Sequence, residues 1–176
     1  MKKQINDKSS DFETIDLTKI PDAFVARTVY VPQHVKAGYA SIMPGFKIKN
    51  DSSGKPVYDN WLDYYKLGFR KMLDKGMERT LIGAILPPNS SHINGVISVI
   101  FKDEKELIEA MGITSSVVLD FFMKTIGSAN LTDSRITEFP LGIQKEFKVA
   151  LFGRALLLNC VNVHYAELWT RDFDRL

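Results

Sequence analysis

Several features that mark secreted or membrane proteins are missing from this sequence. It has one cysteine, Cys160, which rules out an internal disulfide framework and suits a reducing cytoplasm. Its apolar runs fall far short of the roughly 20 residues that a membrane span needs. The basic residues near the N-terminus precede no apolar stretch, so we do not expect a secretory signal. These absences predict a cytoplasmic protein without a membrane partner.

Motifs for cofactors and metals are also missing. The 11 glycines are isolated, with no G-x-G pair and no P-loop, so the backbone offers no recognisable cradle for a nucleotide or methyl-donor cofactor. His34, His92 and His164 lie far apart and no ligand spacing recurs. We therefore expect no cofactor, no metal site and no catalytic residue in this chain.

Two short patterns are weak candidates for chemistry. Cys160 and His164 have i, i+4 spacing, which could pair a thiol with a base, but Cys160 lies beside an apolar stripe and is better interpreted as a small core residue. The acidic run at 103–106, with its lysine, could suggest a nuclease. It is more typical of the solvent-exposed start of a helix, where the helix dipole stabilises acidic side chains.

The composition is that of an ordinary globular domain. Of the 176 residues, 45% are hydrophobic and 25% charged, and the formal net charge is only +2. Because phosphate contacts supply much of the affinity of DNA-binding proteins, this small excess argues against an autonomous DNA binder. It argues less against a domain that reads bases while a larger partner holds the backbone.

Hydrophobic periodicity and turn residues predict an α+β fold, with a small mixed or antiparallel sheet flanked by helices and a long C-terminal helix. The expected strands are 24–31, 46–49 (within a long loop, 36–56), 79–86, 93–101 and 136–139, with 79–86 and 93–101 forming a long hairpin. The expected helices are 59/60 to 75, 105–111, 115/116 to 126 and 143–169. The last would be roughly 40 Å long. We expect a mobile polar leader at 1–20, an α+β domain at 21–142, and a long helix in 143–176 that packs on the domain or on a partner.

Three features favour contact with nucleic acid. On the helix expected from residue 59, Lys66, Arg70 and Lys71 would project away from the apolar face, where Lys66 and Arg70 could track phosphates. A solvated helix face would look the same. Arg79 begins the next expected strand, and we place it on the same side.

The other two features are polar connections. The turn at 87–94 carries His92 and Asn94, which could present polar groups to base edges, although an ordinary hairpin tip also fits. The connection at 124–132 places Lys124, Ser128 and Asn130 beside a glycine, which suits a phosphate or base-edge contact. A simple link between two elements would have the same composition.

Taken in order, these segments resemble a known family. The strings "ERTLIGAILPPNSSHIN" and "VVLDFFMKTIGSANLTDSRITEFPL", followed by a long helix, resemble the target-recognition region of type IIG-like restriction–modification enzymes and their adenine-N6 DNA methyltransferase relatives. The second string is also similar in style to type I specificity subunits. The similarity covers most of the chain from about Arg27 onward.

The resemblance implies a module that selects the DNA sequence to be methylated or cut. In such enzymes the cofactor and adenine-binding motifs lie on another domain, so the implied partners are double-stranded DNA and a methyltransferase or nuclease domain, in cis or in trans. The alternative is a protein–protein scaffold whose long helix docks on a partner without touching DNA. The small net charge and the extended apolar stripe favour that alternative.

Overall fold

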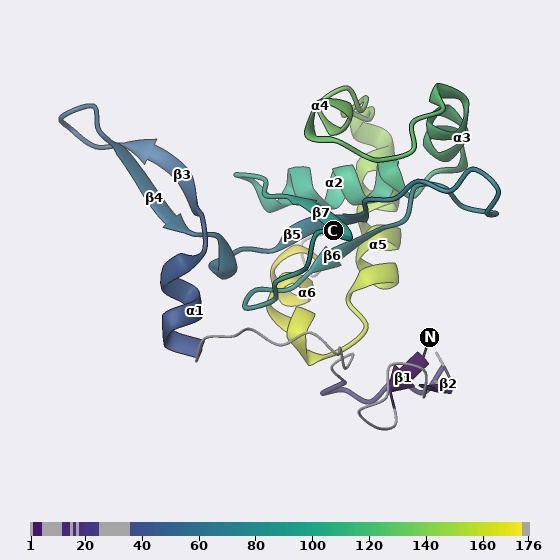
Figure 1. Cartoon of the computed structure of the whole chain (residues 1–176), viewed down its shortest axis with the longest axis horizontal. Coiled ribbons are helices and arrows are strands. Elements are labelled where there is room, and N and C mark those ends of the chain that lie inside the picture. Colours follow the sequence, from purple (N-terminus) through teal and green to yellow (C-terminus); the bar gives the residue numbers. More distant parts are fainter. Residues whose placement is uncertain (1, 5–11, 15, 17, 25–35, 174–176) are drawn as a thin grey trace.

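A computed structural model describes residues 2–4, 12–14, 16, 18–24 and 36–173 (Figure 1). The fold is α+β, as the sequence predicts, and its sheets are small and antiparallel. Two are two-stranded: β1 (Lys2–Gln4) with β2 (Phe12–Thr14), and β3 (Gly45–Asn50) with β4 (Pro56–Asn60). The third has the strand order β6-β5-β7 and lies at the centre of the molecule.

Strand β5 (Lys66–Arg70) is the middle of the central sheet, where the sequence predicts a helix. That prediction is wrong because the apolar residues of the segment also fit the two-residue period of a strand. Leu67 and Phe69 are both 1% exposed, and they join the main core. Asn60 does act as a cap, accepting a hydrogen bond from the Leu62 N–H, but it caps only the single turn η1 (Trp61–Asp63).

The predicted hairpin of strands 79–86 and 93–101 is also wrong. Strands β6 (Gly83–Leu86) and β7 (Val96–Val99) do not pair with each other, because β5 lies between them and pairs with both. The connection at 87–95 therefore returns along the sheet to the end at which β5 finishes. Gly68 makes room for this packing, since a Cβ there would lie 2.7 Å from a methyl carbon of Leu86.

The two helices after the sheet are confirmed. Asp103 caps α2 (Glu104–Thr114), and Ser116 caps α3 (Val117–Ile126). Helix α3 ends at Gly127, whose left-handed φ of 78° is one that glycine adopts at little cost. The strand predicted at 136–139 is wrong: Ile136 ends a short helix, α4 (Asp133–Ile136), and residues 137–139 form a turn.

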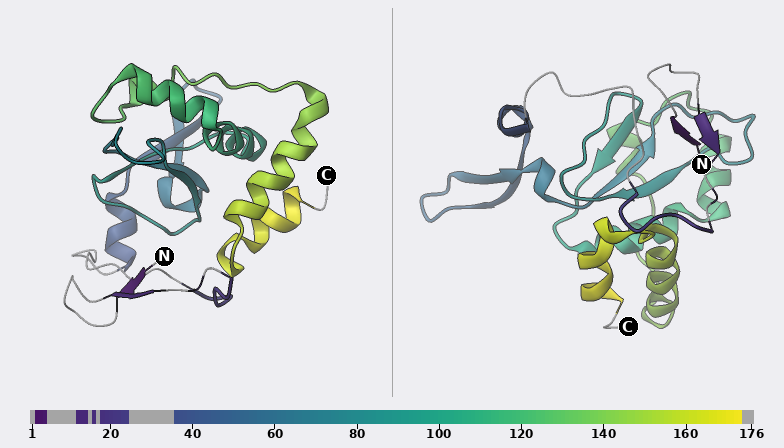
Figure 2. Two further views of the ribbon diagram at one scale, coloured as in Figure 1. Left: turned by 90° about the vertical axis from the view of Figure 1, so that its right-hand side faces the viewer. Right: turned by 90° about the horizontal axis from the view of Figure 1, so that it is seen from below.

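The predicted long C-terminal helix is interrupted. Helix α5 (Lys145–Asn159) is followed by the single turn η2 (Val163–Tyr165) and by α6 (Ala166–Asp172). The Asn159 side chain accepts a hydrogen bond from the Ile85 N–H at 2.9 Å, which ties the end of α5 to β6. The backbone leaves the helical conformation at Cys160, and Asn162 caps η2. As a result α5 and α6 lie side by side, as both views of Figure 2 show.

Helix α1 (Lys36–Ile42) and the β3–β4 hairpin occupy the segment expected to be a loop with a short strand. The strand predicted at 46–49 is confirmed as part of β3. The strand predicted at 24–31 lies outside the described residues apart from Phe24. Half of the leader predicted at 1–20 also lies outside them, and the described half includes strands β1 and β2. No helix among the described residues is long and apolar enough to cross a membrane.

Candidate nucleic-acid interface

Three polar connections meet where strand β5 ends. The Lys71 N–H donates to the Gly95 carbonyl at 3.0 Å, and the Lys71 carbonyl accepts from the Leu131 N–H at 2.7 Å. The Leu73 N–H donates to Ala129, and Met72 forms an isolated antiparallel bridge with Asn130. Parts of the sequence that are up to 60 residues apart thus share one edge. The sequence singles out two of these connections separately, and the structure brings them together.

Lys71 is the centre of this cluster. Its ammonium group donates to the side-chain oxygen of Asn94 at 2.7 Å, and Asn94 is exposed. Ser128 donates to the Asn130 carbonyl at 2.6 Å and so shapes the third connection, while the Asn130 side chain is exposed. Exposed amides beside a lysine can donate to and accept from base edges and phosphates. Lys71, Asn94, Ser128 and Asn130 form what we name the β5-end cluster.

Arg79 and Lys124 are held by a buried acid. Asp120, whose side chain is 5% exposed, lies 3.5 Å from the Arg79 guanidinium and 3.8 Å from the Lys124 ammonium group. It also accepts hydrogen bonds from the N–H groups of Thr80 and Leu81 at 2.8 and 2.7 Å. These contacts fasten the loop after β5 to helix α3.

Both cations have further partners within the chain. Lys124 donates to the carbonyls of Met77 and Glu78, and Arg79 donates to that of Ser115. A phosphate would have to compete with these bonds, so the structure gives both residues a role in positioning the loop.

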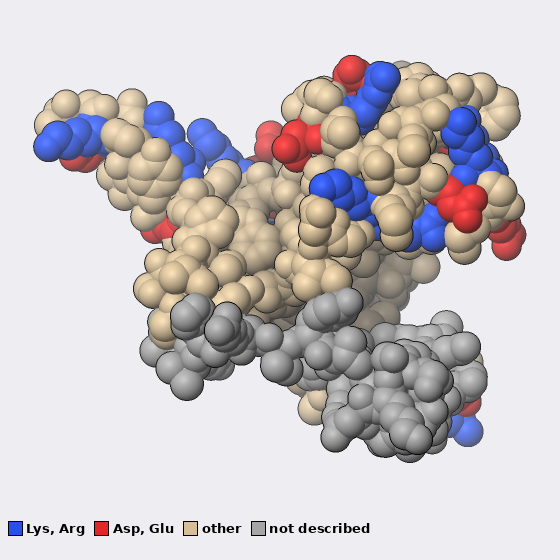
Figure 3. Space-filling model, viewed as in Figure 1, with Lys and Arg blue, Asp and Glu red and all other residues tan. Residues whose placement is uncertain are grey.

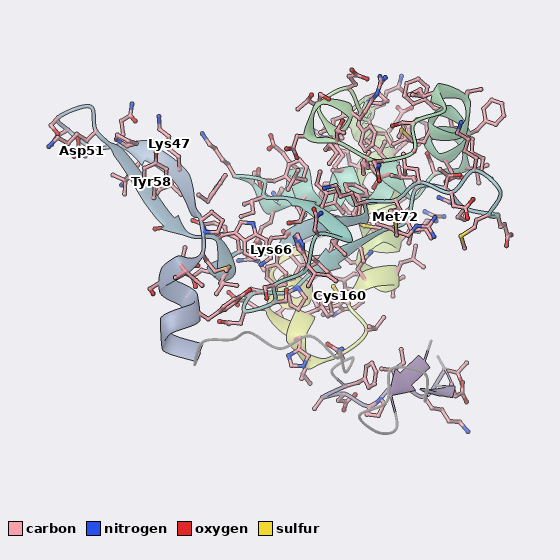
Figure 4. All side chains as sticks on the ribbon, viewed as in Figure 1. Lys47, Asp51, Tyr58, Lys66, Met72 and Cys160 are labelled. Carbon is pink, nitrogen blue, oxygen red and sulfur yellow. The ribbon has the colours of Figure 1, made fainter. Side chains whose placement is uncertain are left out.

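Lys66 does not project from the molecule as predicted. It is 0% exposed, donates to the Tyr64 carbonyl at 2.8 Å and lies 4.4 Å from the centroid of the Trp61 ring. Burial lowers its pKa to about 8. The prediction is wrong because it assigned a helix to a strand whose two faces are both covered. Figure 4 shows Lys66 between the hairpin and the central sheet.

Arg70 and His92 are half-buried and have internal partners. The Arg70 guanidinium contacts the Met77 sulfur at 3.0 Å, while His92 lies 2.8 Å from the Ser98 hydroxyl and edge-on to Trp61. Lys66 and Arg70 are separated by the length of a strand and do not form the predicted pair. His92 fixes the crossover connection against the sheet.

The weak candidates for chemistry gain no support. Cys160 and His164 do not share a helix, because α5 ends at Asn159. Burial raises the pKa of the Cys160 thiol to about 11, which opposes a nucleophilic role. Asp103 is the cap of α2, and the described residues contain no group of three or more His, Cys, Asp or Glu side chains that could hold a metal.

A cavity of about 220 Å³ lies between the sheet, α2 and the segment after α4. Its described lining is apolar apart from the hydroxyls of Thr114 and Thr137, and Thr114 donates to the Ala110 carbonyl. The lining offers no titratable side chain to a substrate. The cavity therefore does not have the convergent polar groups of an enzyme site.

The sequence analysis missed the β3–β4 hairpin, which carries Lys47, Lys49, Lys55 and Tyr58 as exposed side chains. The signal was present: apolar and basic residues alternate from Phe46 to Lys49, and the turn at 51–54 ends in glycine. The density of Gly, Pro, Ser and Asp suggested a loop instead. In Figure 3 this hairpin projects from the rest of the molecule, and lysines lie along its edge.

Comparison with known proteins gives no relative for this chain: no family model, no curated protein and no solved structure matches it.

Proposed function

We propose that this chain is the target-recognition module of a restriction–modification DNA methyltransferase, acting in the cytoplasm. It reads base edges of double-stranded DNA, while a methyltransferase or nuclease domain, in cis or in trans, performs the chemistry. The chain itself is not an enzyme in this proposal. Sequence-specific reading requires donors and acceptors that are held in fixed positions at an accessible surface.

The β5-end cluster carries the proposal. Two exposed asparagines lie on connections that backbone hydrogen bonds fix to the end of β5: Asn94 accepts a hydrogen bond from Lys71, and Asn130 forms a bridge with Met72. Asparagine can bond to adenine with both its donor and its acceptor, and lysine can contact guanine or phosphate. The Asp120 contacts hold the neighbouring loop in place, so little ordering entropy is lost on binding.

The small net charge sets the scale of affinity. With a formal charge of +2, the chain alone can neutralise few phosphates, so the partner domain contributes much of the non-specific attraction. The proposal therefore expects weak binding at physiological salt, and measurable binding at about 20–50 mM salt, where electrostatic contacts to phosphate are stronger.

Fluorescence anisotropy with a labelled duplex tests the proposal. Lys71→Ala should weaken binding and reduce the slope of log K against log salt by about 1 if Lys71 contacts a phosphate. Arg154→Ala is the matched control, because it removes one positive charge from the exposed face of α5, where its neighbours Leu157 and Leu158 are apolar. Equal losses for both variants, or no binding by the wild-type chain, would contradict the proposal.

One observation favours a second function, a protein–protein scaffold. Helix α5 buries Phe152, Ala155 and Leu156 against the core, yet other apolar residues on it and just after it are exposed. These are Phe147, Val149, Leu157, Leu158 and Val161, which are 46–69% exposed. Such an apolar surface is typical of an interface. In this reading, Leu157→Glu with Leu158→Glu abolishes co-purification with a co-expressed partner subunit, and the wild-type chain binds no duplex.

A further inference from the structure

The β3–β4 hairpin is an arm without a core of its own. It spans Gly45–Asn60, and its register is continuous except for a bulge between Lys47 and Lys49. Phe46, Ile48 and Val57 are only half-buried, whereas Lys47, Lys49 and Tyr58 are exposed. Isolated two-stranded hairpins are marginally stable in water. A projecting hairpin therefore adds little to the stability of the fold, and we look for its role in binding. Figure 1 shows it extending away from the central sheet, beyond α1.

The arm carries three lysines and two aspartates, a net charge of +1 over Gly45–Asn60. Among the described residues, the ammonium groups of Lys47, Lys49 and Lys55 make no ion pair or side-chain hydrogen bond. The two acids are engaged within the chain. Asp51 accepts from the Ser53 hydroxyl and from the N–H groups of Ser53 and Lys55 at 2.7–2.9 Å, and Asp59 accepts from the Tyr64 hydroxyl at 2.6 Å.

The base of the arm is fixed to the rest of the molecule. The Asn60 amide donates to the Ala40 carbonyl at 2.8 Å, and the Trp61 N–H donates to the Pro44 carbonyl at 3.2 Å. The Phe46 ring meets the Tyr64 ring edge-on, with 5.4 Å between their centroids. From Tyr64 the chain passes directly into β5. The direction of the arm is therefore coupled to the sheet that ends in the β5-end cluster.

We propose that this arm is a β-ribbon that enters the major groove of double-stranded DNA, with Lys47 and Lys49 on the phosphates. The inference rests on the proposed function. The major groove is about 12 Å wide and admits a two-stranded ribbon. Six extended residues reach roughly 20 Å, which exceeds the groove depth of about 8.5 Å. Figure 3 shows a notch between the arm and the α3–α4 part of the molecule, with basic side chains on the arm.

Tyr58 lies on the same face of the ribbon as Lys47, whereas Lys49 pairs with Val57 beyond the bulge and lies on the other face. Tyr58 lies opposite Lys47 in the register and is 57% exposed. Gly45 keeps the ring close to the ribbon, since a Cβ at this position would lie 2.9 Å from the Tyr58 Cβ. The tip adds Asn50, Ser52 and Ser53, which are short polar side chains able to meet base edges. The arm thus offers a phosphate contact on its strands and polar groups at its end.

The test uses the full chain and a random-sequence duplex of about 30 base pairs at low salt, where phosphate contacts dominate. Lys47→Ala with Lys49→Ala should lower affinity tenfold or more and reduce the salt slope by about 2. The matched control is Lys145→Ala with Arg154→Ala, which removes the same charge from exposed positions on α5. Lys47→Arg with Lys49→Arg should restore the wild-type affinity. Unchanged unfolding midpoints verify that the variants fold.

The outcomes separate the two proposals. If the wild-type chain binds and the arm variant binds equally well, the arm is not in the groove, and the proposed function stands without it. If the wild-type chain does not bind any duplex, the proposed function is wrong and this inference falls with it. Equal losses for the arm variant and the α5 control would show a non-specific charge effect and overturn the arm's role.

The groove is tested with modified duplexes. Glucosylated 5-hydroxymethylcytosine fills the major groove with sugar, so the wild-type chain should bind a duplex that contains it at least tenfold more weakly. Saturation of the minor groove with distamycin should change the affinity by less than twofold. The reverse pattern would overturn major-groove entry. Tighter binding to an RNA duplex of the same sequence would also overturn it, because the major groove of A-form RNA is too narrow for side chains to read.

Discussion

The ammonium group of Lys71 donates a hydrogen bond of 2.7 Å to the side-chain oxygen of Asn94, 23 residues further along the chain. The bond joins the end of β5 to the turn before β7. The sequence assigns these residues to a helix and to a hairpin tip, but the strand order β6-β5-β7 makes them neighbours. Whether the pair contacts DNA is the question that the proposed function raises.

Asp120 should be the most important polar residue for stability near the β5-end cluster. Asp120→Ala leaves two buried N–H groups without an acceptor and removes the partner of Arg79 and Lys124. We expect the free energy of unfolding to fall by about 3 kcal/mol, because each buried N–H left without an acceptor costs about 1–3 kcal/mol. Urea denaturation measures this. Asp133→Ala, at an exposed acid, should change it by less than about 0.5 kcal/mol. Similar losses of unfolding free energy in both variants would show that the Asp120 contacts do not stabilise the fold.

Gly112 should be required for the contact between α2 and α5. A Cβ at this position would lie 2.6 Å from the Leu151 Cγ, which is closer than real Cβ atoms approach. Gly112→Ala should therefore destabilise the fold by about 1–3 kcal/mol despite the better helix propensity of alanine. Gly95→Ala is the control, because nothing lies within 4 Å of a Cβ there. A Gly112→Ala variant as stable as the control would mean that the two helices separate without cost.

Lys66 should make stability depend on pH. Burial lowers its pKa to about 8, whereas an unfolded lysine titrates near 10.5. Between these values the unfolded chain binds more protons, so the free energy of unfolding should rise with pH. The Lys66→Met variant lacks this ammonium group but keeps the tyrosines and Cys160. Their pH-dependent contributions to the free energy of unfolding therefore cancel when the two proteins are compared. The difference in unfolding free energy, wild type minus variant, should increase from pH 8 to pH 10 and be flat below pH 7. Parallel profiles would rule out a buried ammonium group.

Cys160 should be unreactive in the folded chain. Burial raises its pKa to about 11, whereas a free thiol has a pKa of about 8.5. At pH 8 its thiolate fraction is then lower by about two orders of magnitude, and so is its rate of alkylation. Iodoacetamide labelling followed by mass spectrometry should be slow in buffer and fast in 8 M urea. Rapid labelling of the folded chain would contradict this prediction and would favour Cys160 as a nucleophile, although Cys160 and His164 do not share a helix.

The sequence predicts those elements whose signals are local. Ser116 and Gly127 bound α3 as expected, because a cap and a left-handed stop act within one turn of the helix. The alternation from Phe46 to Lys49 identifies part of β3. The α+β class follows from the mixture of such signals and is confirmed. Nothing more than neighbouring residues is needed for these predictions.

The failures arise where distant residues decide the structure. The apolar stripe of α5 continues past Cys160, yet the helix ends at Asn159, whose side chain accepts a hydrogen bond from the Ile85 N–H, 74 residues away in the sequence. Lys66 has the chemistry of a surface residue, yet it is buried because successive residues of β5 are buried on both faces of the strand. The β5-end cluster could not be predicted for the same reason. Its members are polar residues on separate connections, and only the strand order makes them one surface.

Selection of bound DNA from a randomised duplex library tests the central claim most directly. The full chain is immobilised, duplexes retained at low salt are amplified and sequenced over several rounds, and the Asn94→Ala with Asn130→Ala variant is treated in parallel. The account predicts that one short motif recurs among duplexes bound by the wild-type chain and is lost or relaxed in the variant. Retained duplexes without a common motif, or the same motif from both proteins, would contradict reading by the β5-end cluster.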